Sequence, residues 1–343
     1  MKAMLLTEPS KLRITEFETP MPSAGELLVR VRACGICGSD VHGFNGSSGR
    51  RIPPLIMGHE AAGVVERVGA GVERLPEGDR VTFDSMISCG RCSFCRGGTT
   101  NLCDNRRILG VSCDDYRQHG AFAEYVVVPE HIVYRIPDDL SFEHAAMVEP
   151  VSVAVHAIHR TPVRLGSTAV VIGCGMIGLL CVQSLRAAGC SSIVAVDLDS
   201  TRRDRAIAAG ANEALDPSSQ SVAGTVIERP EGRGVDVAGE AVGASEPIKT
   251  AIESVRKGGS VTLIGNISPS VELPLQSVVT REIQLIGTCA SNGDYPGCLR
   301  LMASKAIDVE PMITASVPLE EGPVWFDRLH SGEAGLMKII LQP

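Results

Sequence analysis

The sequence predicts an α/β protein with two kinds of region: a mostly-β region and an open, doubly wound parallel sheet with its helices. Two observations carry this prediction. Residues 1 to about 150 contain short extended runs, such as 26–32 and 123–128, that are separated by glycine and proline clusters, which is typical of irregular β-structure. From about residue 167, short apolar runs alternate with helical stretches, and this alternation is the pattern of βαβ units.

The second region reads as buried strands joined by helices. A helix is expected at 176–188 and another at about 200–209, because each stretch ends at a glycine, Gly189 or Gly210. After about residue 290 the alternation is lost, and a last strand-like run covers 336–341. The strands of the parallel sheet are expected at 168–172, 192–196, 235–238, 261–264 and 283–286.

The composition limits the class of protein. Of the 343 residues, 44% are apolar and 21% are charged, and the formal net charge is only −8. This composition provides for a large core and gives no sign of disorder or of a nucleic-acid partner. The first residues lack a leader-like apolar run, and no apolar stretch reaches about 18 residues. We therefore expect a cytoplasmic, unprocessed chain with no membrane partner.

Four of the twelve cysteines are crowded into one short stretch. Cys89, Cys92, Cys95 and Cys103 have the spacing C-x2-C-x2-C-x7-C. Thiolates at this spacing can surround one zinc ion and leave no open coordination position, so we predict a structural zinc site. An iron–sulfur cluster and four unrelated thiols are the alternatives.

A second metal site is expected from separated pieces of the chain. Cys37, the pair His59 and Glu60, and Glu149 supply a thiolate, an imidazole and carboxylates. Such a mixed set has fewer than four obligatory protein ligands, so water or substrate can take the remaining position. Each residue alone would be an ordinary core or surface residue, and only their joint occurrence predicts a catalytic zinc ion. The expected content is thus two zinc ions per chain.

A third pattern predicts a nucleotide site. Gly173, Gly175 and Gly178 form a G-x-G-x-x-G that follows an expected strand and opens an expected helix. The three glycines would permit the tight turn, the approach of a pyrophosphate and the close packing of helix on strand. Asp197 stands at the end of the next strand, where a carboxylate can accept the ribose hydroxyls of NAD and repels the 2′-phosphate of NADP.

Two features weigh against that preference. Arg202 and Arg203 lie just beyond Asp197 and could attract a phosphate, and Asp197 could be an ordinary helix cap. We nevertheless expect NAD. Further residues expected to contact the cofactor are Met176, Ile177, Arg202, Val242 and Gly265.

The order and spacing of these motifs resemble the zinc-dependent medium-chain dehydrogenases over nearly the whole chain. The motifs are Cys37, Gly58-His59-Glu60, the cysteine lobe, the run 120–125 and the nucleotide fingerprint. Glu149 and the run after it, 150–156, are similar to the sorbitol, iditol and galactitol-1-phosphate dehydrogenase branch. The resemblance implies a GroES-like catalytic domain, residues 1–151 and 290–343, around an inserted Rossmann domain, residues 152–289. It also implies a homotetramer or homodimer.

The implied activity is reversible, zinc- and NAD-dependent oxidation of a secondary alcohol to the ketone. The substrate would be a polyol or a sugar alcohol, with or without a phosphate. Cys37, His59 and either Glu60 or Glu149 would hold the catalytic zinc. By analogy with the family, Ser39 would pass the alcohol proton outward, with His42 or the cofactor ribose as the next station; His42 as a plain surface residue is the alternative.

Several alternatives accompany this prediction. The segment 288–295 lacks the arginine that precedes an aromatic residue in sorbitol dehydrogenases, which argues against sorbitol itself as the substrate. Butanediol dehydrogenases also have a glutamate at the position of Glu149, and threonine dehydrogenases share the cysteine lobe, so 2,3-butanediol and L-threonine are candidate substrates. Arg50 and Arg51 are expected on the solvated surface, with binding of a substrate phosphate as the alternative. A non-catalytic binding protein on the same fold would be expected to lack a zinc ligand or a fingerprint glycine, yet all of them are present. A zinc-free quinone reductase would have no reason to keep the cysteine lobe and Cys37, so a measurement of the metal content distinguishes this class.

Overall fold

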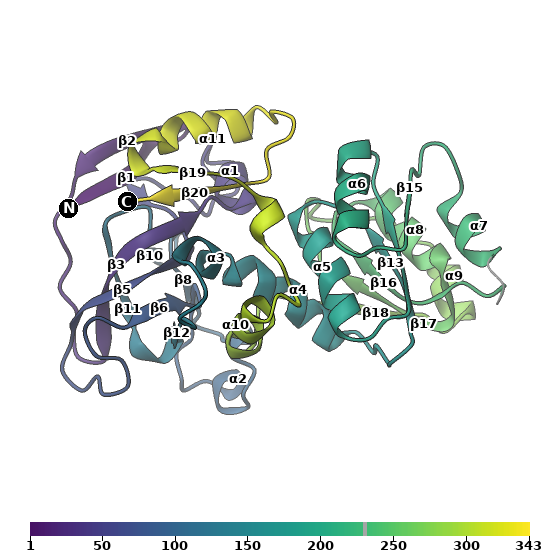
Figure 1. Cartoon of the computed structure of the whole chain (residues 1–343), viewed down its shortest axis with the longest axis horizontal. Coiled ribbons are helices and arrows are strands. Elements are labelled where there is room, and N and C mark those ends of the chain that lie inside the picture. The colour runs from purple at the N-terminus through teal and green to yellow at the C-terminus, as the bar shows by residue number, and fades with distance from the viewer. Residues whose placement is uncertain (229–231) are drawn as a thin grey trace. The chain divides into compact units, whose positions relative to one another are not determined.

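The computed structural model describes residues 1–228 and 232–343 and divides the chain into two compact units. Unit 1 comprises Met1–Glu149, Tyr295–Ser304 and Val309–Pro343, and unit 2 comprises Pro150–Asp294 and Lys305–Asp308. In Figure 1 the purple N-terminal and yellow C-terminal strands belong to the same unit. Unit 2 is therefore an insertion, and unit 1 is completed by residues far apart in the sequence.

The main sheet of unit 1 has seven strands in the order β12-β6-β5-β3-β20-β19, with β11 also paired to β3. Neighbouring strands are antiparallel, except that β19 and β20 run parallel. The expected strands at 26–32, 123–128 and 336–341 are confirmed as β3, β11 and β20. The bounds are β3 (Glu26–Gly35), β5 (Glu60–Val68), β6 (Arg80–Phe83), β11 (Tyr125–Pro129), β12 (Val133–Arg135), β19 (Ile313–Pro318) and β20 (Lys338–Gln342).

Smaller elements complete unit 1. A three-stranded sheet has the order β2-β1-β4, and two-stranded sheets form from β7 with β8 and from β9 with β10. These strands are β1 (Lys2–Glu8), β2 (Lys11–Glu16), β4 (Leu55–Ile56), β7 (Met86–Ile87), β8 (Arg107–Ile108), β9 (Val111–Ser112) and β10 (Arg117–Gln118). The helices are α1 (Gly38–Gly43), α2 (Ser93–Arg96), α3 (Phe142–Ala146), α10 (Tyr295–Ala303) and α11 (Gly322–His330), and α4 (Val148–Arg160) leads from unit 1 into unit 2.

Unit 2 is a six-stranded sheet in the order β15-β14-β13-β16-β17-β18, and every pair is parallel. This confirms the predicted doubly wound α/β sheet. The strands are β13 (Thr168–Ile172), β14 (Ser192–Val196), β15 (Glu213–Leu215), β16 (Val235–Glu240), β17 (Val255–Leu263) and β18 (Gln284–Gly287). The helices are α5 (Met176–Ala187), α6 (Ser200–Ala208), α7 (Val222–Ile227), α8 (Ser245–Ser254) and α9 (Leu275–Thr280).

Two details of this sheet differ from the prediction. β15 is not expected from the sequence, because a three-residue strand carries too little periodicity. β17 begins at Val255 rather than at Val261, since its polar, glycine-containing first half is extended by pairing with β16. No helix within the described ranges has both the length and the apolar character needed to cross a membrane.

An aromatic cluster attaches the C-terminal part of unit 1 to its N-terminal part. Phe326 on α11 is fully buried. Its ring centroid lies 5.7 Å from that of Phe44 and 5.8 Å from that of Phe122, in tilted and edge-on arrangements. Such pairs add to the free energy of burial, so this cluster fixes α11 against the core.

We predict that Phe326→Ala lowers the free energy of unfolding by about 3–5 kcal/mol, the range for removing a buried aromatic ring. Val324→Ala on the same helix is the control, because Val324 is 61% exposed and should change stability little. Chemical denaturation followed by circular dichroism measures both. Equal stabilities of the two variants would contradict the anchoring role.

Candidate active site

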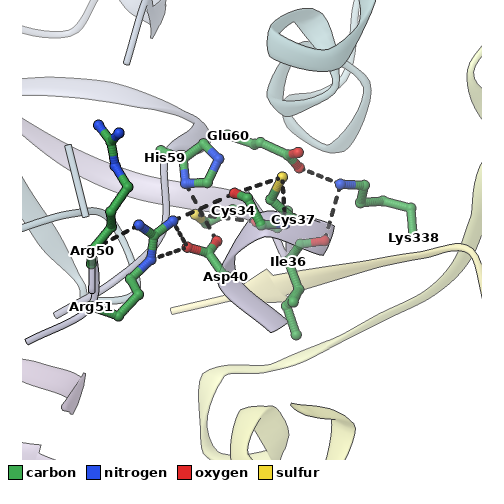
Figure 2. Close-up of polar contacts among 11 residues, drawn as sticks. Cys34, Ile36, Cys37, Asp40, Arg50, Arg51, His59, Glu60 and Lys338 are labelled. Carbon is green, nitrogen blue, oxygen red and sulfur yellow. Dashed lines mark hydrogen bonds and ion pairs between the residues drawn. The ribbon is translucent and has the colours of Figure 1, made fainter. Parts of the chain in front are cut away.

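Three of the predicted zinc ligands meet in unit 1. Cys37 directly precedes α1, His59 directly precedes β5, and Glu60 begins β5. One ligand atom from each residue lies within 4.8 Å of the other two, and Figure 2 shows the three side chains converging. Neighbouring ligand atoms of a tetrahedral zinc ion are about 3–4 Å apart. The donor set and its spacing therefore fit one zinc ion with a position left for substrate.

A buried carboxylate lies beside the imidazole of His59. Asp40 on α1 is fully buried, and its Oδ2 lies 3.4 Å from His59 Nδ1. Burial alone would raise the pKa of Asp40, but the charges of His59 and Arg51 outweigh it and lower the pKa to about 2. Asp40 is thus ionised at neutral pH. Because Nδ1 of His59 faces Asp40, Nε2 is the nitrogen available to a metal.

Glu60 is held by a lysine from the other end of the sequence. Nζ of Lys338 donates hydrogen bonds to Glu60 Oε2 at 2.5 Å and to the Ile36 carbonyl at 3.0 Å, as Figure 2 shows. Burial acts to lower the pKa of Lys338, but the charges of Glu60 and Cys37 raise it above its ordinary value. Lys338 is therefore an ammonium ion. Sequence reasoning missed it, although a lysine inside an apolar run predicts a buried anionic partner.

Glu149 lies beside this cluster. It is the second residue of α4, and it interacts electrostatically with His59, Glu60 and Lys338. Burial raises the pKa of Glu149 to about 7; His59 and Lys338 oppose this rise, and Glu60 adds to it. The structure thus brings both candidate carboxylates together, with Glu60 in the three-residue group and Glu149 next to it.

Ser39 and His42 lie on the same short helix, but only Ser39 contacts the cluster. The Ser39 hydroxyl lies 3.3 Å from Cys37 Sγ and 3.4 Å from Arg51 Nη2. His42 is exposed, which is compatible with either a relay or a surface role.

The expectation that Arg51 is a solvated surface residue is wrong. Arg51 is only 5% exposed, and its guanidinium forms an ion pair of 2.8 Å with Asp40. The side chain turns inward because a buried carboxylate needs a compensating cation. Its neighbour Arg50 is exposed, as expected.

The four cysteines of the lobe converge at a separate place in unit 1. Their Sγ atoms lie within 4.8 Å of one another, close to the separation of about 3.8 Å between thiolates around a tetrahedral zinc ion. The backbone N–H groups of Arg91 and Cys92 lower the pKa of the Cys89 thiol to about 6. Throughout the described part of the chain the twelve cysteines are free. The chemistry of this donor set fits a zinc ion enclosed by four sulfurs.

The nucleotide fingerprint occupies the turn between β13 and α5 in unit 2. Gly173 has φ of +90°, a conformation that side chains other than glycine rarely adopt. A Cβ on Gly178 would lie 1.8 Å from the Gly173 carbonyl oxygen, whereas a Cβ on Gly175 would meet nothing within 4 Å. The loop therefore packs tightly against the helix and leaves space beside Gly175, where a pyrophosphate is expected.

Asp197 follows β14 and faces the same loop. Its Oδ2 accepts a hydrogen bond from the Cys174 N–H at 2.7 Å and its Oδ1 from the Asp199 N–H at 2.9 Å. Each oxygen keeps a lone pair for a further donor. Arg202 is close, with Nη1 3.9 Å from Asp197 Oδ2.

Some of the residues expected to contact the cofactor line one cavity, and the others belong to neighbouring segments. Gly173, Asp197, Arg202 and Val242 line a cavity of about 410 Å³, a size typical of small-molecule sites. Gly265 packs against the backbone of Val242, because a Cβ on Gly265 would be 2.2 Å from the Val242 carbonyl carbon. Met176 and Ile177 form the first turn of α5. The carboxylate in this cavity suits the ribose hydroxyls of a dinucleotide.

Comparison with known proteins gives consistent matches. The model of the alcohol dehydrogenase GroES-like domain matches residues 23–138, and that of zinc-binding dehydrogenases matches residues 177–304. Sorbitol dehydrogenase of Bacillus subtilis (strain 168) is 33% identical over 348 residues, which cover 100% of this chain and 97% of that protein.

Solved structures agree over the full length. The 2R,3R-butanediol dehydrogenase of Bacillus subtilis is 31% identical with a TM-score of 0.90, covering 100% of this chain and 99% of that one. Galactitol-1-phosphate dehydrogenase of Escherichia coli is 26% identical with a TM-score of 0.92, covering 100% of both chains.

We predict that zinc leaves the two sites at different rates. A chelator should empty the cluster of Cys37 first, because that site keeps a position open to solvent, whereas four thiolates enclose the lobe site. Release followed with a chromogenic chelator should have two phases. Cys37→Ser should remove the fast phase, and Cys103→Ser should remove the slow phase and lower the Tm. A single zinc per chain, or a single phase, would refute this.

Proposed function

Because the chain belongs to the zinc-dependent medium-chain dehydrogenases, in their polyol branch, we propose that it oxidises a secondary alcohol of a polyol or sugar alcohol to the ketone with NAD. One observation carries this proposal. A thiolate–imidazole–carboxylate cluster with an open position stands in unit 1, and a carboxylate suited to ribose stands at the G-x-G-x-x-G loop of unit 2. The group in unit 1 can hold the metal that activates an alcohol, and the carboxylate in unit 2 can hold the ribose of a nicotinamide dinucleotide.

We propose that Cys37, His59 and Glu60 hold the catalytic zinc. When bound there, zinc supplies a Lewis acid that lowers the pKa of the substrate hydroxyl. Cys37 and Glu60 together bring two negative charges, which would cancel those of the dication. Lys338, 2.5 Å from Glu60, returns one positive charge to the cluster. Glu60 can thus act as a ligand while the site keeps its attraction for an oxyanion.

Ser39 is proposed to move the proton. Its hydroxyl adjoins Cys37, and it can accept the proton of the substrate alcohol while its own proton passes outward to His42 or to the cofactor ribose. A nicotinamide bound in unit 2 would supply the acceptor for the hydride of the carbinol carbon. The exposure of His42 supports its exchange of this proton with water.

Glu149 is proposed to recognise a second hydroxyl. It lies beside the ligand group and interacts with His59, Glu60 and Lys338, so it can orient water or a neighbouring substrate hydroxyl. A vicinal diol or polyol offers such a group, whereas a simple monoalcohol does not. The likeness to a butanediol dehydrogenase supports 2,3-butanediol as a second candidate substrate.

The segment 288–295 bears on which polyol is used. Its acidic residue Asp294 accepts hydrogen bonds within unit 2, from His156 at 3.0 Å and His159 at 2.7 Å. Both carboxylate oxygens are therefore engaged, and the segment has no arginine to hold a polyol. We propose a substrate other than sorbitol itself. Following the family, we also propose a homodimer or homotetramer, which gel filtration with light scattering tests.

We predict that turnover of a vicinal diol or polyol exceeds that of an isosteric monoalcohol by at least about tenfold in kcat/KM, or about 1.4 kcal/mol. Glu149→Ala should remove most of this advantage and leave the zinc of the cysteine lobe in place. This ratio of kcat/KM is measured by following NAD reduction with polyols, polyol phosphates, 2,3-butanediol, 2-butanol and L-threonine. If 2-butanol equals every diol and Glu149→Ala is neutral, the protein is a general secondary-alcohol dehydrogenase.

We predict that Asp197→Ser weakens the use of NAD and relieves the repulsion of NADP. The expected loss in kcat/KM for NAD is about 1–3 kcal/mol, the range for hydrogen bonds to a charged group. Asp199→Ser is the matched control, because Asp199 caps α6 through the Arg202 N–H and serine is also a good cap. Equal use of NAD and NADP by the wild type would mean that Arg202 or Arg203 outweighs Asp197.

A further inference from the structure

Arg51 is buried behind the active site with almost all of its hydrogen-bonding capacity used. Its Nε and Nη2 donate to Asp40 Oδ1 at 3.1 and 2.8 Å, Nη2 also lies 3.4 Å from Ser39 Oγ, and Nη1 donates to the Arg50 carbonyl at 3.0 Å. Figure 2 shows this fork around Asp40. Four of the five guanidinium N–H groups therefore have partners within the protein, which argues against a role in binding a substrate phosphate.

The surrounding backbone is built to hold this side chain. A Cβ on Gly43 would lie 2.8 Å from Arg51 Cγ, so the glycine leaves room for the arginine against α1. The Ile52 N–H donates to the Ser112 carbonyl at 3.1 Å, and the Ser112 N–H donates to the Arg50 carbonyl at 3.2 Å. These bonds tie the backbone on both sides of Arg51 to β9, so the guanidinium is placed from a fixed support.

The contacts of Arg51 decide how Asp40 can point. Both hydrogen bonds end on Oδ1 of Asp40, which anchors this oxygen and leaves Oδ2 on the side of His59, 3.4 Å from Nδ1. Without a cation, a fully buried carboxylate would be strongly unfavourable. Arg51 thus supplies both the charge that keeps Asp40 in the core and the geometry that aims it at the imidazole.

We propose that Arg51 is a positioning residue that couples the His59 ligand, through Asp40, to the Ser39 hydroxyl. Its N–H toward Ser39 occupies one lone pair of that oxygen and leaves the other to accept the proton of the alcohol. One planar guanidinium therefore sets the direction of a zinc ligand and of the proton acceptor together. The inference rests on the roles proposed above for His59 and Ser39.

The test compares Arg51→Met with the matched control Arg50→Met and with the conservative Arg51→Lys. Steady-state kinetics with NAD and the best diol, solvent deuterium isotope effects on kcat, and zinc release to a chromogenic chelator are measured. For Arg51→Met we expect a fall in kcat of about 10- to 100-fold with a smaller change in KM, and faster release from the first site, in line with the effect of losing residues that orient metal ligands.

Arg50→Met should match the wild type in every measurement, and Arg51→Lys should fall between Arg51→Met and the wild type, since it restores the charge but not the fork. The solvent isotope effect should grow in Arg51→Met, because proton transfer from a misplaced Ser39 limits the rate. If Arg51→Met does not fold, Arg51→Lys carries the test and must show the kcat loss, the faster zinc release and the larger isotope effect.

Two outcomes separate failure of this inference from failure of the proposed function. If the wild type oxidises a diol while the Arg51 variants equal Arg50→Met, the inference is overturned and the proposed function stands. If none of the tested alcohols supports NAD reduction by the wild type, the proposed function fails. Zinc release still tests the inference in that case: an unchanged fast phase in the Arg51 variants overturns it, and an accelerated one supports the link through Asp40 to His59.

Discussion

The ion pair between Glu60 and Lys338 links the first residue of β5 to the first residue of β20, and both side chains are almost fully buried. Either charge alone would be costly to bury. The sheet of unit 1 can therefore close with β20 only in the register that brings the two together. Gly35 makes this possible, since a Cβ there would lie 2.3 Å from Glu60 Oε2. The geometry of the proposed zinc-binding group, Cys37, His59 and Glu60, depends on this closure.

Two buried cations stand behind the proposed ligands and do different work. Lys338 adjusts the charge of the ligand set through Glu60, and Arg51 sets the direction of the imidazole through Asp40. A lysine suits the first role, because a single ammonium acts as a point charge; an arginine suits the second, because its fork fixes an orientation. Unit 2 contributes a separate site, in which the Gly173 loop and Asp197 follow two adjacent parallel strands.

Local patterns in the sequence predict the parts of the molecule whose residues are close together in the chain. Three features belong to this class: the turn from β13 to α5, Asp197 after β14, and the cysteine lobe. The spacing of their residues in the sequence is enough to predict how they are arranged. Arg51 and Lys338 do not, since their partners come from other elements, Lys338 from 278 residues away. The sequence shows only that a lysine interrupts an apolar run. β15 was missed because its three residues, 213–215, are too few to show the alternation of apolar and polar residues that indicates a strand.

The position of Lys338 has a consequence for the order in which the protein is made. Unit 2 consists almost entirely of one continuous segment and can assemble as soon as that segment exists. Glu60, in contrast, waits for a partner that is synthesised 278 residues later, on the order of 15–60 s at ordinary translation rates. During that interval the nascent unit 1 lacks the cation that compensates Glu60 in the finished sheet. Binding of zinc at the proposed site, with its charges balanced, is therefore expected only in the completed fold, after unit 2 has been synthesised.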